Sequence, residues 1–160
     1  MLKERIIKWN RDRGLLETFD PDLERRMLSE EAREFYMADT FPKKLAEYSD
    51  FVFVLEGTKA KYGCNAGTKT ESFNSYEEYK ELMAWAKNLQ DEMFIILDRI
   101  RFRANLKNIG DIMTLSLTYV CECNELKGLD KSNGKIVKNA DYIDPATLIA
   151  KRIGVIHVPF

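Results

Sequence analysis

Residues 20–55, DPDLERRMLSEEAREFYMADTFPKKLAEYSDFVFVL, decide the fold, because they predict two consecutive helices. Asp20 before Pro21 is typical of a helix start, since the aspartate accepts hydrogen bonds from free backbone N–H groups and proline fits the first helical position. Thr40 with Pro42 marks the second start in the same way. Apolar residues recur at helical spacing in both segments, which predicts that both helices pack into a core.

The rest of the chain continues the helical pattern, with only 4 Pro and 8 Gly to interrupt it. Ser75–Glu78 reads as a capping box that opens a long helix reaching about Asn105, and Asn108 is expected to cap a further helix. Together, the expected helices cover residues 2–13, 20–38, 40–63, 75–105, 109–127 and 144–154.

These elements predict a single all-α domain over residues 1–160, since a chain of this length suits one core. The expected architecture is a helical bundle of about five helices, with its core helices at about 2–128. The C-terminal tail, 129–160, is expected to be short and irregular or hairpin-like, with a tight turn at Ser132–Gly134.

Charge and composition exclude several classes of partner. The chain has 25 Lys+Arg and 26 Asp+Glu, a net charge of −1, so neither nucleic acid nor an anionic membrane is expected as a partner. The longest strongly apolar run, Phe51–Leu55, is too short to span a bilayer, and the charged residues 1–5 lead us to expect no signal peptide. Cys64, Cys121 and Cys123 cannot all pair within one chain, so we expect reduced thiols and a cytoplasmic location.

Two acidic segments interrupt the apolar pattern of the first two quoted helices. Glu31 and Glu34 are three residues apart, as are Glu47 and Asp50, so each pair projects from one helical face. The second helix is apolar nearly all round, so its two carboxylates are expected to be partly buried. Buried like charges need neutralising, and carboxylate oxygens suit hard cations such as Mg²⁺ or Mn²⁺. On the pattern alone, a solvated face paired with Lys and Arg stays an equal alternative.

Several stretches together resemble a known family, the MazG-like all-α nucleoside triphosphate pyrophosphohydrolases, whose relatives include phosphoribosyl-ATP pyrophosphohydrolases and dimeric dUTPases. Residues 30–34, EEARE, and 47–50, EYSD, are similar to the EExxE…ExxD signature of this group. Residues 120–127, VCECNELK, resemble its VxESNxxK segment. Residues 134–145 resemble its GKxxK…Y…P tail, and residues 9–15 resemble its first helix less specifically.

The resemblance implies Mg²⁺-dependent hydrolysis of a nucleoside triphosphate to the monophosphate and pyrophosphate, with Mn²⁺ as a substitute ion. Phosphoanhydride cleavage needs charge neutralisation and a nucleophile held in line, which clustered metal ions provide. Carried over residue by residue, the resemblance implies metal ligands at Glu31, Glu34, Glu47 and Asp50, a general base at Glu30, and phosphate-binding residues at Asn124, Lys127 and Lys138.

The resemblance also implies a housecleaning role on deoxynucleotides or noncanonical nucleotides. A homodimer is expected, with a tetramer as the other possibility. The dimer is expected to bury the apolar stripe of the long helix, made of Leu82, Trp85, Leu89, Met93, Ile96 and Ile100. The alternative function is a non-catalytic helical module for oligomerisation or regulation that binds nucleotide or metal; Glu30 beside the ligand set favours the enzyme.

Overall fold

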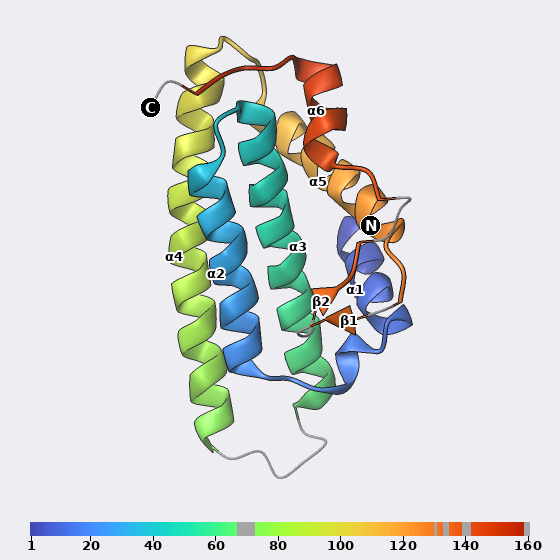
Figure 1. Cartoon of the computed structure of the whole chain (residues 1–160). Helices are drawn as coiled ribbons and strands as arrows, with labels where there is room; N and C mark the ends of the chain where they lie inside the picture. Colours follow the sequence, from blue (N-terminus) through green and yellow to red (C-terminus); the bar gives the residue numbers. More distant parts are fainter. Residues whose placement is uncertain (67–72, 130, 133–134, 139–141, 159–160) are drawn as a thin grey trace.

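The computed structural model describes residues 1–66, 73–129, 131–132, 135–138 and 142–158 (Figure 1). Within these residues the fold is all-α, as predicted, with six α-helices at the places of the six expected ranges: five in the bundle and a short one in the tail. The helices are α1 (Leu2–Asp12), α2 (Pro21–Met37), α3 (Phe41–Asn65), α4 (Phe73–Arg103), α5 (Ile109–Glu125) and α6 (Pro145–Ile153). A single 3-10 turn, Leu15–Glu17, connects α1 to α2.

Helix α3 lies at the centre of the bundle and contacts each of the other five α-helices. Figure 1 shows α2 and α4 along one side of it, and α1, α5 and α6 on the other. Its side chains Phe41, Leu45 and Phe51 are fully buried, as is Phe35 of α2. The central position explains why the sequence of α3 is apolar nearly all round.

Four helix starts are capped as predicted. Asp20 accepts hydrogen bonds from the backbone N–H groups of the first turn of α2, and Thr40 does the same for α3. Asn108 caps α5 and Asp144 caps α6. Each of these side chains satisfies a backbone donor that would otherwise have no partner inside its helix.

Helix α4 differs from its prediction in two ways. It begins at Phe73, so Ser75 lies inside the helix and not at its cap, and it ends at Arg103. The apolar stripe that we expected between two copies of the chain packs inside this chain, because Leu82 and Met93 are almost fully buried in the main core. Its stripe supplies the core contact for α2 and α3, so the predicted interface on that stripe is wrong.

Two other helix ends differ by two residues from the prediction. Helix α3 continues past Gly63 to Asn65, because one glycine in a well-packed helix costs only about 1 kcal/mol. Helix α5 ends at Glu125, and the chain then tightens: Lys127 N donates to Asn124 O, which is the shorter 3-10 pattern. This tighter turn keeps Asn124 and Lys127 close together.

The corner between α2 and α3 is held from two sides. Lys44, only 2% exposed, donates through Nζ to the carbonyl of Phe35 at 2.8 Å, near the end of α2. A C-terminal strap, residues 156–158, pairs with the corner: Phe41 N donates to Ile156 O, and Val158 N donates to Asp39 O. These bonds fix the angle at which α2 meets α3.

The tail is partly hairpin-like, as predicted. Strands β1 (Lys131–Ser132) and β2 (Lys135–Ile136) pair antiparallel. The tight turn predicted at Ser132–Gly134 falls largely on residues 133–134, which lie outside the described residues. Helix α6 follows and packs Ile149 into the main core.

Candidate functional site

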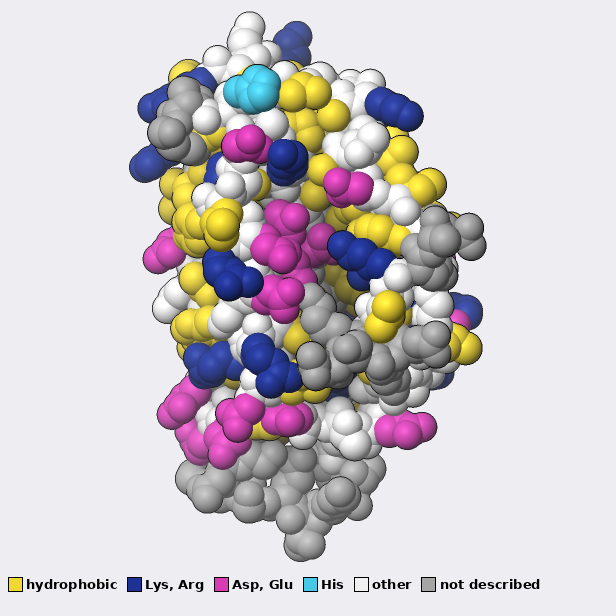
Figure 2. Space-filling model, viewed as in Figure 1, with side chains coloured by type: hydrophobic (Ala, Val, Ile, Leu, Met, Phe, Trp, Pro, Cys, Tyr) yellow, Lys and Arg dark blue, Asp and Glu magenta, His cyan; other side chains and the backbone are white. Residues whose placement is uncertain are grey.

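Helices α2 and α3 present their polar faces to a single cavity of about 340 Å³. From α3, the lining positions 47, 50, 54, 57 and 61 follow one another at spacings of three and four, so they form one face of the helix. From α2, positions 27, 30, 31 and 34 do the same. In Figure 2, acidic side chains gather in a hollow at the middle of this face, with Lys and Arg on both sides.

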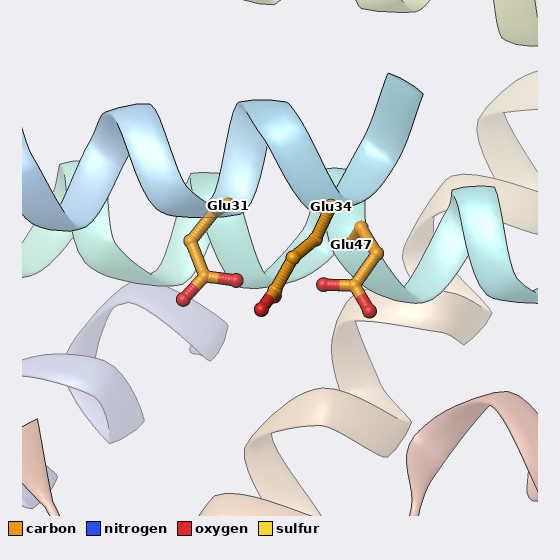
Figure 3. A group of neighbouring side chains, drawn as sticks. All are labelled: Glu31, Glu34 and Glu47. Carbon is orange, nitrogen blue, oxygen red and sulfur yellow. The ribbon is translucent and has the colours of Figure 1, made fainter. Parts of the chain in front are cut away.

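Three carboxylates meet at one end of the cavity: Glu31 and Glu34 from α2, and Glu47 from α3 (Figure 3). One carboxylate oxygen from each residue lies within 4.8 Å of the others, and Glu31 is only 7% exposed. We call these three residues the acidic cluster. The prediction that the two acidic segments face each other from adjacent helices agrees with this geometry.

The acidic cluster carries a strong electrostatic conflict. Burial, followed by the nearby charges of Asp50, Glu34 and Glu31, raises the pKa of the Glu47 carboxyl to about 9. At neutral pH, Glu47 therefore keeps its proton unless a positive charge arrives. An all-oxygen donor set with this repulsion fits a hard divalent cation such as Mg²⁺ or Mn²⁺.

Asp50 and Glu30 line the same cavity but lie outside the acidic cluster. Asp50 is half-buried one turn along α3 from Glu47, and its charge is the main electrostatic cause of the raised Glu47 pKa. Glu30 is half-buried on α2, next to Glu31 in the chain but rotated about 100° around the helix. Glu30 and Asp50 therefore share the cavity with the acidic cluster without belonging to it.

The wall formed by the end of α5 and the tail carries two lysines and one acid, Asp144, and we call it the basic wall. Asn124, 4% exposed, and Lys127 come from the end of α5, and Lys138 comes from the tail. All eight site residues predicted from the sequence therefore line one cavity. The Trp9 indole N–H donates to the Asn124 carbonyl at 2.8 Å, which ties α1 to this end of α5.

Tyr142 organises the basic wall. Lys138 Nζ lies 4.8 Å from the centre of its ring, and Lys127 Nζ lies 5.3 Å from it, so the ring holds both ammonium groups by cation–π contact. Burial, followed by the charge of Asp50, raises the pKa of the Tyr142 phenol well above its usual value. The phenol is therefore neutral at physiological pH and stands close to the acidic end.

Sequence reasoning missed the wall that lies away from the acidic cluster. Asn10 and Leu15 near the N-terminus, and Phe53, Gly57 and Lys61 on α3, line that end. For α3 the sequence could have indicated this wall, because positions 57 and 61 continue the helical spacing of 47, 50 and 54 and so lie on the same face. No pattern in the sequence places Asn10 opposite them, because that contact joins segments almost 50 residues apart.

The thiols play no visible part in this chemistry. Burial raises the pKa of Cys121 and of Cys123 to about 11, so both are neutral at physiological pH. A neutral buried thiol behaves as a small apolar side chain and is a poor metal ligand.

No protein-family model matches the chain, and no curated protein or solved structure matches it either. The likeness to MazG-like proteins accordingly rests on the motifs quoted above. The function has to be inferred from the cavity and its charges.

Proposed function

We propose that this protein is a Mg²⁺-dependent nucleoside triphosphate pyrophosphohydrolase that releases a nucleoside monophosphate and pyrophosphate. The observation that carries the proposal is the acidic cluster, set in a cavity whose opposite wall carries Lys127 and Lys138. A triphosphate with its cation matches both walls, since the acids take the cation and the lysines take phosphate oxygens. A purely structural cluster would have no use for a cavity between the two charges.

The acidic residues of the cavity would have two different roles, ion binding and proton acceptance. Glu31, Glu34, Glu47 and Asp50 would hold the ion. Bound Mg²⁺ supplies neutralisation of the phosphate charge and a site where water becomes a stronger nucleophile. Glu30, turned about 100° from Glu31 on the same helix, would accept the proton of the attacking water.

The basic wall supports the substrate. Lys127 and Lys138 would meet the negative phosphates, and the Asn124 amide would donate to a phosphate oxygen. Because Tyr142 contacts both lysines, it holds the two charges in one place instead of leaving them to move independently.

The wider proposals follow the same resemblance. We propose a substrate that is a deoxynucleotide or noncanonical nucleotide, a role in nucleotide-pool housecleaning, and a cytoplasmic location. A homodimer is supported by large apolar side chains that α4 leaves exposed, Phe94, Ile95 and Phe102, and a tetramer would use the same kind of surface. No helix in the described ranges is both long and apolar enough to cross a membrane.

The test is release of pyrophosphate and monophosphate from a panel of NTPs and dNTPs, with and without Mg²⁺. Wild-type protein should convert at least one of them only with the ion, and Glu34→Gln should lower kcat/KM by about 100-fold or more. Glu81→Gln is the matched control, because Glu81 is exposed on α4 and does not line the cavity.

The outcomes separate the two functions that the sequence leaves open. Turnover that needs Mg²⁺ and is lost only in the cavity variant supports the enzyme. Binding of Mg²⁺ or nucleotide without turnover of any member of the panel would overturn catalysis in favour of a binding module. Equal rates for Glu34→Gln and Glu81→Gln would remove the acidic cluster from the mechanism.

A further inference from the structure

The cavity has a second end that is polar without being acidic. Asn10 of α1 and Gly57 of α3 lie there, with the apolar side chains of Leu15, Met27 and Phe53 also on the wall. Gly57 follows Asp50 by two helical turns, which places this end ~10 Å along α3 from the acidic end. A ribose separates a nucleobase from its phosphates over a distance of this order.

Asn10 is a buried residue whose side chain lines the cavity and makes one hydrogen bond within the described chain. Its side chain is 3% exposed, and its Nδ2 donates to the Ile6 carbonyl at 2.8 Å, which fixes the orientation of the carboxamide. No residue in the described part of the chain donates a hydrogen bond to Oδ1. Oδ1 is not sealed from solvent but opens onto the cavity, so a ligand N–H can take the place of water as its donor.

Gly57 is what allows Asn10 to occupy this position. A Cβ at residue 57 would lie 3.1 Å from Asn10 Nδ2 and 3.2 Å from Oδ1, closer than side chains normally pack. The carboxamide therefore rests directly against the backbone of α3, at the level of the cavity. Any residue larger than glycine would push the amide away from its present place.

We propose that Asn10 and Gly57 form a nucleobase-binding end of the cavity, in which Asn10 Oδ1 accepts a hydrogen bond from an N–H group at the edge of the base. The proposal rests on the proposed function, since it takes the acidic end as the place of the phosphates. The apolar side chains around the amide suit the faces of a heterocycle. A sugar phosphate without a base has neither the N–H edge nor the flat ring that this end of the cavity would bind.

Binding, which needs no turnover, tests the proposal. Calorimetry would measure the affinities of the five common nucleoside 5′-monophosphates and of ribose 5-phosphate, which carries no base. At least one monophosphate should bind wild-type protein at least tenfold more tightly than ribose 5-phosphate, as one buried hydrogen bond plus ring contact implies. Gly57→Ala and Asn10→Ala should each reduce this ratio by about fivefold or more.

Gly63→Ala is the matched control, because it is the same substitution in the same helix and its Cβ would meet nothing within 4 Å. It should leave the ratio unchanged. Retained binding of ribose 5-phosphate shows that a variant is folded, and Asn10→Ala keeps the test open if Gly57→Ala does not fold. The proposal is overturned if no monophosphate binds more tightly than ribose 5-phosphate, or if both glycine variants change the ratio equally.

The test distinguishes this proposal from the proposed function. Base-dependent binding without pyrophosphate release would overturn only the hydrolysis. Pyrophosphate release with base-independent binding, unchanged in Asn10→Ala, would overturn only the nucleobase-binding end.

Discussion

Acidic side chains lie at two places between α2 and α3: Glu24 alone at one, and the acidic cluster at the other. The two places differ in how the negative charge is balanced. Glu24, 1% exposed, accepts hydrogen bonds from Thr58 Oγ1 at 2.7 Å and from Lys61 Nζ at 3.0 and 3.1 Å. The acidic cluster instead brings carboxylate against carboxylate, and the pKa of Glu47 rises to about 9. At Glu24 the negative charge is therefore balanced by a side chain of the protein itself, Lys61. Where the same two helices assemble like charges beside a cavity, the balancing charge is expected to come from a ligand.

The largest effect is expected from breaking the internally balanced pair. Lys61→Met leaves the Glu24 carboxylate buried without its cation, which should cost about 3–5 kcal/mol of unfolding free energy. The melting temperature should fall by about 10 °C or more. Urea unfolding followed by circular dichroism measures this loss.

Lys59→Met is the control for that substitution. Lys59 pairs with Glu56 at 3.3 Å on the same helix, but its side chain is 44% exposed, so the loss should stay below about 1 kcal/mol. Similar losses for the two variants would show that the Glu24–Lys61 pair is not the stabilising element that its burial suggests.

The acidic cluster should bind metal more tightly as the pH rises. Below pH 9 an ion must displace the proton of Glu47, so the affinity for Mg²⁺ or Mn²⁺ should increase by up to about tenfold per pH unit until the pH approaches 9. Calorimetry in buffers of different ionisation enthalpy should find about one proton released per site at pH 7.5. Affinity that does not change with pH would show that Glu47 is not protonated in the metal-free protein.

Glu47→Gln should stabilise the protein when no metal is present. The pKa of Glu47 is higher in the folded state than its usual value of 4.5, so the unfolded chain holds fewer protons between about pH 4.5 and 9. The contribution of Glu47 to stability is therefore greatest below pH 4.5 and falls as the pH rises toward 9. Discounted for solvent around a half-buried group, the gain in the variant at pH 8 should be about 1–2 kcal/mol.

Two measurements check the Glu47 prediction. Thermal unfolding in EDTA should show a gain at pH 8 that disappears near pH 4. Added Mg²⁺ should raise the melting temperature of the wild type but not that of the variant. A variant less stable than the wild type in EDTA at pH 8 would mean that Glu47 is already neutralised within the chain.

The smallest effect is expected on the basic wall. Tyr142→Leu removes the ring that contacts Lys127 and Lys138, and KM for the triphosphate should rise about three- to tenfold with little change in kcat. Tyr142→Phe keeps the ring and should behave as the wild type. If Phe and Leu give the same kinetics, the ring does not position the lysines.

The elements that the sequence predicted well are those set by local chemistry. Caps at Asp20, Thr40, Asn108 and Asp144 depend on a side chain and the N–H groups two or three residues ahead, so they are legible in a short window. The spacing of the two acidic motifs is similarly local. Each motif therefore kept its face when α2 and α3 packed together.

The parts that could not be predicted depend on packing between distant segments. The apolar stripe of α4 identifies a buried face but not the partner that buries it, and the expected second copy proved to be the core of the same chain. Asn10 against Gly57, and Glu24 against Lys61, join helices whose contact is set by the whole bundle. The roles of all eight site residues, the acidic cluster included, remain predictions.

The strap over the α2–α3 corner also has a consequence for biosynthesis. Thr40 is bridged to His157, so this corner receives its edge partner only after more than a hundred further residues have been translated. At ribosomal rates of 5–20 residues per second, that delay is roughly 6–25 s. During this interval the corner between α2 and α3 lacks the backbone hydrogen bonds that residues 156–158 later make with it.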